Sequence, residues 1–206
     1  MTVSLDLDTL LALAGYAFAA TWTPGPNNMM LASSGATFGW QATLPHAMGV
    51  ALGFPLMFFL ISLGLGQAFE TLPAFRMGLA WLGCAVMLWL AWRIASAAPT
   101  TTRRAEGRTP LSFIGAAAFQ WVNPKAWVMC LSVSAAFVTG QAPMAEAAIG
   151  ATVFVAAGLS SSQGWTLFGT GIARVMGDGI GIRVFNIAMG TLLGLSALWL
   201  VFDPIA

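Results

Sequence analysis

The chain alternates between long apolar runs and short polar connections, and the runs have the length of membrane-spanning helices. A spanning helix needs about 20 mainly apolar residues. The segments that meet this requirement are Leu10–Phe38, Ala42–Leu65, Phe75–Ala97, Leu111–Val138, Ala147–Ile172 and Val184–Phe202. Ser160-Ser161-Ser162-Gln163 interrupts the fifth run, which is the least regular of them. The pattern predicts an all-α integral membrane protein with six transmembrane helices.

Two of these runs carry a proline-containing break near their middle. The breaks are Thr23-Pro24-Gly25-Pro26-Asn27-Asn28 and Asn123-Pro124-Lys125. Proline lacks an amide donor and clashes with the preceding turn, so each run is predicted to form two half-helices. Within hydrocarbon, such a break is tolerated only where it is buried in protein or lines a wet cavity. Broken helices at corresponding positions of two halves indicate a substrate site. The alternative is a pair of kinks that only shape the bundle.

The two halves of the chain resemble each other. Pro24 and Pro124 lie 100 residues apart, and Leu82–Leu90 resembles Leu193–Leu200 with one gap. Because three helices is an odd number, a second copy must enter the membrane from the other side. We therefore expect one transmembrane domain over residues 1–206, built from inverted repeats at about 8–98 and 110–204.

Composition excludes a soluble domain. Hydrophobic residues make up 58% of the chain and charged residues 7%, with a mean hydropathy of +0.82, whereas soluble domains carry about 25% charged residues. A net charge of +1 gives no reason to expect a nucleic-acid partner. The N-terminus holds Asp6 and Asp8 and no basic residue, so we expect no cleaved secretory signal.

The charged residues lie in the connections and predict the orientation. Connections on one side carry the basic residues Arg93, Arg103, Arg104, Arg108, Arg174 and Arg183. The other side carries Asp6, Asp8, Glu70, Glu146 and Asp203, with Arg76 as its one basic residue. Basic residues favour the cytoplasmic side. We therefore place the arginine-rich loop in the cytoplasm and both termini outside it.

Lys125 is the one lysine of the chain, and it falls near the middle of its run. It lies 14 residues after Leu111, or roughly 20 Å along a helix. An ionised lysine at that depth is costly unless it is paired or wet. No acidic residue lies inside a helix core, which leaves a substrate anion, backbone carbonyls or water as partners. The alternative is a lysine that reaches an interface by snorkelling.

The first break supplies groups that complement a cation. A half-helix beginning near Asn27 presents unpaired amides and the positive end of its dipole, which suit an anion. Asn27, Asn28 and Asn123 add side-chain donors and acceptors, although capping of a half-helix is an equal alternative for an asparagine there. Pro24, Gly25, Pro26 and Pro124 complete the predicted substrate site.

Three further polar positions are candidates. Ser161 and Gln163 belong to the polar patch of the fifth run, where they either line the path or hydrogen-bond between helices. His46, the one histidine, titrates near neutral pH and joins Lys125 as a candidate for proton coupling. Packing or hydrogen bonding is the more ordinary role of a lone helical histidine.

These motifs together resemble the LysE/RhtB superfamily of small bacterial exporters. The resemblance rests on Pro24-Gly25-Pro26-Asn27, on a glycine-rich second helix that includes Gly49 and Gly53, on the basic loop, and on Asn123-Pro124-Lys125. It covers essentially the whole chain. It implies export of amino acids or related metabolites across the bacterial cytoplasmic membrane, driven by the proton gradient, and leaves a homo-oligomer open. No cofactor or metal is expected, and the lack of a buried carboxylate favours neutral substrates.

Other classes of function fit the residues less well. A membrane thiol-redox carrier needs two cysteines that meet, but the position that matches Cys130 in the first half is Met30. A metal-ion exporter needs His, Cys or carboxylate clusters, which one histidine does not supply. A membrane enzyme needs a nucleophile beside a base, and the serine patch with a distant His46 gives no such pair.

Overall fold

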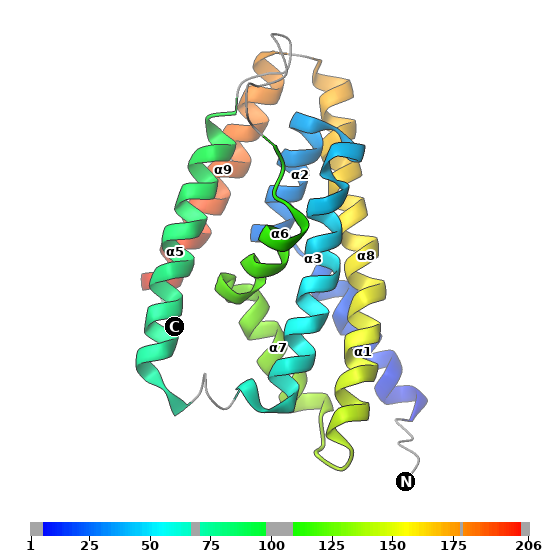
Figure 1. The fold of residues 1–206 in the computed structure, drawn as a ribbon. Helices are drawn as coiled ribbons and strands as arrows, with labels where there is room; N and C mark the ends of the chain where they lie inside the picture. The colour runs from blue at the N-terminus through cyan, green and yellow to red at the C-terminus, as the bar shows by residue number, and fades with distance from the viewer. Residues whose placement is uncertain (1–5, 67–70, 98–108, 178, 203–206) are drawn as a thin grey trace.

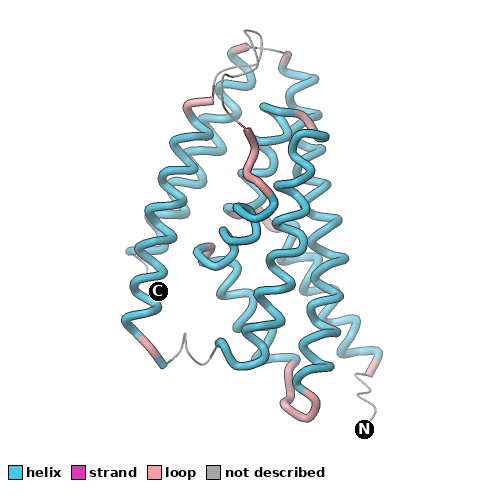
Figure 2. Tube along the Cα trace, viewed as in Figure 1, coloured by secondary structure: helices cyan, strands magenta, loops and turns pink. Residues whose placement is uncertain are grey.

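Every regular element that the structure describes is helical (Figures 1 and 2). The computed structural model describes residues 6–66, 71–97, 109–177 and 179–202. The elements are α1 (Leu7–Trp22), α2 (Pro26–Phe38), α3 (Trp40–Leu60), the π-helical turn η1 (Ile61–Leu65), α5 (Pro73–Ala95), α6 (Phe113–Phe119), the 3-10 turn η2 (Gln120–Val122), α7 (Pro124–Phe137), α8 (Pro143–Met176) and α9 (Ile180–Phe202). The predicted all-α class is confirmed.

Both predicted breaks are present. The first run divides into α1, with 16 residues, and α2, with 13 residues, and they are separated at Thr23–Gly25. At 1.5 Å per residue these half-helices are about 24 and 20 Å long, so neither alone crosses a hydrocarbon core of about 30 Å. The second run divides at Asn123 into α6 with η2, and α7. Each break therefore lies inside the bundle rather than at its end.

Four described helical segments are long and apolar enough to cross a membrane unaided. They are Trp40–Leu65, Pro73–Ala95, Pro143–Met176 and Ile180–Trp199. Figure 1 shows α1 and α2 leading from the N-terminal end of the bundle to the far end, and α6 and α7 leading back. The long helices α3 and α8 pack against α2, and α5 pairs with α9 at the side.

The polar patch of the fifth run does not interrupt its helix, which corrects the expectation. α8 is continuous from Pro143 to Met176. The hydroxyl of Ser160 donates to the carbonyl of Ala157, and that of Thr166 donates to the carbonyl of Ser162. Hydroxyl side chains that bond to their own preceding turn leave the backbone ladder intact.

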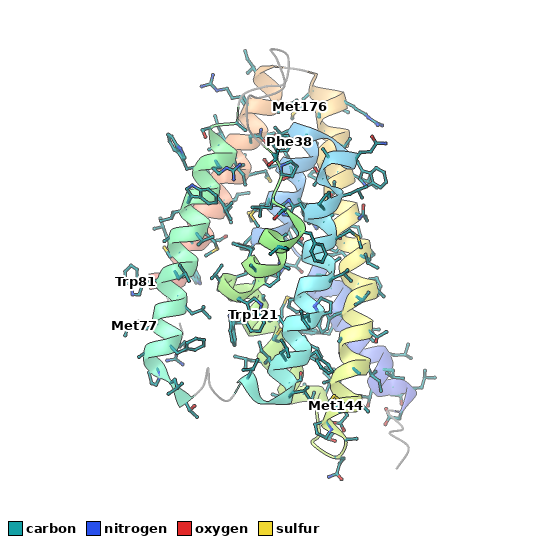
Figure 3. The ribbon with its side chains drawn as sticks, in the orientation of Figure 1. Phe38, Met77, Trp81, Trp121, Met144 and Met176 are labelled. Carbon is teal, nitrogen blue, oxygen red and sulfur yellow. The ribbon has the colours of Figure 1, made fainter. Side chains whose placement is uncertain are left out.

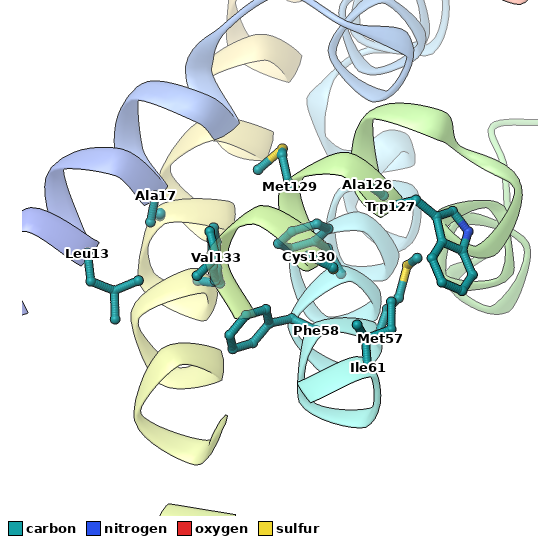
Figure 4. Close-up of a cluster of buried hydrophobic side chains, with 13 residues drawn as sticks. Leu13, Ala17, Met57, Phe58, Ile61, Ala126, Trp127, Met129, Cys130 and Val133 are labelled. Atoms are coloured by element: carbon teal, nitrogen blue, oxygen red, sulfur yellow. The ribbon is translucent and has the colours of Figure 1, made fainter. Parts of the chain in front are cut away.

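Close packing holds the half-helices to the long helices. A Cβ at Gly53 would lie 2.6 Å from Ala117 Cα, and one at Gly49 would lie 2.8 Å from Ala116 Cβ, so the Gly-x-x-x-Gly face of α3 meets α6 directly. Small residues at these positions let the two helix backbones approach closely. Figure 4 shows the largest buried apolar cluster, in which Phe58 of α3 and Cys130 of α7 pack with residues of α1 and α8.

Apart from Lys125, the described charged residues separate between the two ends of the bundle. Arg93, Arg174 and Arg183 lie near the end where α5 and α8 finish and α9 begins, whereas Asp8, Glu146 and Arg76 lie in the first turns of α1, α8 and α5 at the other end. The loop with Arg103, Arg104 and Arg108 is outside the described residues. Apolar side chains such as Met77 and Trp81 project outward from α5, as expected of a surface in lipid (Figure 3).

Candidate functional site

The two helix breaks meet at Lys125. Its Nζ donates a hydrogen bond to the carbonyl oxygen of Thr23 across 2.6 Å, which joins the start of α7 to the end of α1. The two breaks, which the sequence analysis assigned to one substrate site, therefore lie close together. A backbone carbonyl was one of the partners considered for this lysine, and the structure shows that contact.

The C-terminal carbonyls of α1 are held by side chains from three other helices. Asn28 Nδ2 donates to the carbonyls of Thr21 and Thr23 at 2.9 and 2.8 Å, and Ser161 Oγ donates to that of Thr21 at 2.7 Å. These acceptors form the negative end of the α1 dipole, and a cation there is stabilised by about 0.3–2 kcal/mol. A hydrogen bond to a charged group adds about 1.5–3 kcal/mol. Lys125 thus has a stabilising partner even though the site holds no acid among the described residues.

The two half-helices after the breaks begin differently. Asn123 caps α7, because its Oδ1 accepts from the amide of Lys125 at 3.2 Å. Gly25 is the N-cap of α2, where no side chain caps the helix. The first amides of a helix have no partner within it. Capping therefore accounts for Asn123, whereas Asn27 and Asn28 have other partners.

Gln120 is a site residue that the sequence reasoning missed. Asn27 Nδ2 donates to Gln120 Oε1 at 2.8 Å, and Gln120 Nε2 donates to Asn27 Oδ1 at 3.4 Å and to the carbonyl of Ala116 at 2.8 Å. The glutamine is fully buried. A signal was available, because Gln120 is a polar residue inside an apolar run and only three positions before Asn123. This pair is a second link between the breaks.

A cavity of about 50 Å³ lies where the breaks meet, and we call it the central cavity. Its polar lining residues are Thr21, Asn27, Asn28, Asn123, Lys125, Ser161 and Ser162, and Phe54, Met129 and Phe154 are among the apolar ones. Gly25 also lines it, and a Cβ there would lie 2.8 Å from Lys125 Cδ. The cavity has room for a few water molecules. Six of the ten predicted substrate-site residues, including Gly25, therefore line one cavity.

Other predicted residues lie around or away from this space. Pro24, Pro26 and Pro124 form the turns of the breaks without lining the cavity. Gln163 does not line it, and its Oε1 accepts from Trp40 Nε1 at 2.7 Å. Two residues correspond to about 200° around a helix, which directs Gln163 away from the side of Ser161.

His46 lies in a second cavity of about 60 Å³ that shares no lining residue with the central one. The imidazole is 1% exposed, and its Nδ1 is 3.2 Å from Ser34 Oγ. Its Nε2 is buried without a partner among the described residues. The two candidates for proton coupling therefore occupy different places.

Cys84 and Cys130, the thiols that a redox carrier would need to bring together, belong to separate core clusters. The described part of the chain also holds no group of three His, Cys, Asp or Glu side chains arranged to bind a metal ion. Neither observation favours the redox or the metal alternative.

Comparison with known proteins agrees with the family resemblance of the sequence motifs. The model of the LysE type translocator family matches residues 18–203. The cysteine/O-acetylserine efflux proteins of Escherichia coli strain K12 and of Shigella sonnei strain Ss046 are each 32% identical over 162 residues, which cover 78% of this chain and 82% of the relative. No solved structure matches the chain.

Proposed function

The chain belongs to the LysE type translocator family, whose members are multi-pass proteins of the bacterial inner membrane, and we propose that it exports small neutral amino acids. Relatives named for efflux of cysteine and O-acetylserine support this substrate class. The central cavity supports it as well, since its described lining has a cation, amides and hydroxyls but no carboxylate that would pair with a second positive charge.

One observation carries the proposal: Lys125 Nζ lies 2.6 Å from Thr23 O at the wall of the central cavity, beside the uncapped start of α2. A substrate carboxylate offers the lysine a charged acceptor in place of this carbonyl, and charge-assisted hydrogen bonds are about twice as strong as neutral ones. The amides at the start of α2 suit the same carboxylate. The hydroxyls of Ser161 and Ser162 are acceptors for the substrate ammonium.

Substrate binding also has to move the breaks. A space of about 50 Å³ holds a few waters but not an amino acid. Room for the substrate arises when Lys125 releases Thr23, since this bond and the Asn27–Gln120 pair hold the two breaks together. We infer that the exchange of Thr23 O for a substrate carboxylate opens the central cavity.

We further propose that the proton gradient drives export. Lys125 is the first candidate to carry the proton. Its protonated ammonium is needed to bind the substrate carboxylate, and loss of that proton would favour dissociation of the substrate. His46 is the second candidate, at the other cavity. A variant that retains counterflow but loses export driven by a pH gradient identifies the coupling residue.

The proposed architecture has six spans: α1 with α2, α3 with η1, α5, α6 with η2 and α7, α8, and α9, arranged as two inverted repeats with both breaks near the membrane midplane. The separation of charges between the ends supports termini outside the cytoplasm. An impermeant maleimide should label Asp8→Cys in intact cells and leave Arg174→Cys unlabelled. Labelling of position 174 and not of position 8 would indicate the reverse orientation, and equal labelling of both positions would contradict the proposed topology.

Counterflow in proteoliposomes tests the proposed function. Vesicles that contain the purified protein and unlabelled O-acetyl-L-serine should accumulate the labelled compound transiently, whereas vesicles without protein should not. A panel of unlabelled competitors, including cysteine, alanine and lysine, defines the class. Uptake that only lysine or arginine inhibits would contradict a neutral substrate, and no uptake of any amino acid would contradict the proposed function.

A further inference from the structure

The cavity at His46 has the chemistry of a second binding site. It lies between α2, α3, α5 and the segment before α6. Its polar lining includes Ser33, Ser34, Thr37, His46 and Arg93, and its described lining residues include no acid. We propose that this space, the docking cavity, widens to bind the carboxylate and ammonium groups of an amino acid at the arginine-rich end of the bundle, since about 60 Å³ holds only a few waters before it opens. The inference rests on the proposed export function and adds a second substrate-binding site to it.

Arg93 is the group that recognises the carboxylate. It is partly buried near the end of α5 and lines the docking cavity, and its Cζ lies 5.0 Å from the ring of Trp89, which is not a lining residue. Its planar fork of donors matches a carboxylate in a bidentate manner. Among the residues that the structure describes, no carboxylate forms an ion pair with Arg93.

His46 supplies the unmet polar atom of the docking cavity. The ring is almost completely buried, with Nδ1 directed to Ser34 Oγ and Nε2 left without a partner in the described chain. A buried polar atom without a hydrogen bond costs about 1–3 kcal/mol. Because Nε2 is closed to solvent in this structure, a ligand removes this cost once the imidazole turns toward the docking cavity. The nitrogen accepts from an ammonium or donates to a carboxylate, according to the tautomer.

Helix α2 lines both cavities, and its residues at the docking cavity come after those at the central cavity in the sequence. Asn27 and Asn28 line the central cavity, and Met30, Ser33 and Ser34 line the docking cavity. The seven residues from Asn27 to Ser34 correspond to about 10 Å along α2. With the basic end in the cytoplasm, an exported substrate reaches Arg93 and His46 before Lys125.

Two cysteine reporters measure substrate binding at the two cavities separately. In purified protein, O-acetyl-L-serine should protect both Ser34→Cys and Ser161→Cys from N-ethylmaleimide, slowing each reaction at least threefold. Adding Arg93→Gln should abolish protection at position 34 and leave it at position 161. Adding Lys125→Met should do the reverse. Arg76→Gln, which removes a charge from the other end of α5, is the matched control and should change neither.

Other outcomes overturn the inference. The docking cavity is excluded if position 34 is never protected, or if its protection depends on Lys125 and not on Arg93. Loss of protection at position 161 alone contradicts the central site and leaves the docking cavity standing. Because Ser34→Cys disturbs the contact with His46, equilibrium dialysis of labelled O-acetyl-L-serine on protein without reporters gives a second measure. Two molecules per chain are expected in the wild type and one in Arg93→Gln, and one in both contradicts the proposal.

Discussion

Replacing Lys125 with methionine should weaken substrate recognition strongly while the protein still folds. Methionine has a similar length and no charge. Its carbonyl partner is not orphaned, because Thr23 O also accepts from Asn28 Nδ2 at 2.8 Å. The variant loses a charge-assisted bond of about 1.5–3 kcal/mol and a dipole contribution of about 0.3–2 kcal/mol. It also loses the cost of a buried charge, about 2.5–3.5 kcal/mol for insertion at mid-membrane. The net change in stability therefore lies between a gain of about 2 kcal/mol and a loss of about 2.5 kcal/mol.

The effect on substrate binding is not compensated in the same way. The bond between the ammonium and the substrate carboxylate is worth about 1.5–3 kcal/mol, which corresponds to a loss of affinity of roughly 10- to 150-fold. Counterflow of labelled O-acetyl-L-serine, measured over a range of concentrations, reports this change as a higher half-saturation concentration. Arg76→Met removes an exposed cation outside both cavities and should behave as the wild type.

The assay also separates two roles of the lysine. Loss of counterflow with unchanged thermal stability in detergent supports substrate binding. Retained counterflow with lost export in a pH gradient assigns Lys125 to proton coupling alone. Wild-type values in both assays would refute the reasoning, because they would leave the bond to Thr23 without a function.

Further variants test the surroundings of the lysine. Lys125→Arg should retain partial transport at best, because the guanidinium is larger and Gly25 limits the space, whereas a snorkelling residue would tolerate the change. Gly25→Ala should raise the half-saturation concentration several-fold, since its Cβ would lie 2.8 Å from Lys125 Cδ while φ of −175° suits any residue; Gly15→Ala, with nothing within 4 Å, is the control and should leave transport unchanged. A double-mutant cycle of Asn27→Ala and Gln120→Ala should give a coupling energy of about 0.5–3 kcal/mol in thermal unfolding, and additive effects would contradict a direct link.

The breaks could be predicted from sequence because proline occurs there together with other residues that disfavour a helix. Pro24 is followed by Gly25 and Pro26, and Pro124 follows Asn123, whereas Pro45 and Pro55 lie inside the continuous helix α3. Lys125 stands out as the one lysine in an apolar chain. The apolar runs likewise predicted where the described helices lie along the chain. The continuity of α8 could not be predicted as easily, since a serine either breaks a helix or bonds to its own preceding turn, and the tertiary surroundings decide between these.

The partners of the site residues required the structure. The sequence offered capping and substrate binding as equal roles for the asparagines. Only the fold shows that Asn123 caps α7, that Asn28 holds the end of α1, and that Asn27 pairs with Gln120. Gln163 was grouped with Ser161 because they are close in sequence, but they lie on different sides of α8. Such distinctions depend on which helices face each other, which a single apolar sequence leaves open.

The central claim is that a substrate carboxylate replaces Thr23 O at Lys125, between the two helix breaks. An experimental structure with O-acetyl-L-serine bound tests it most directly. The account predicts the carboxylate about 2.7–2.9 Å from Lys125 Nζ, close to the first amides of α2, with the Thr23 carbonyl displaced. A bound substrate that leaves the Lys125–Thr23 bond intact and contacts neither break would contradict the account.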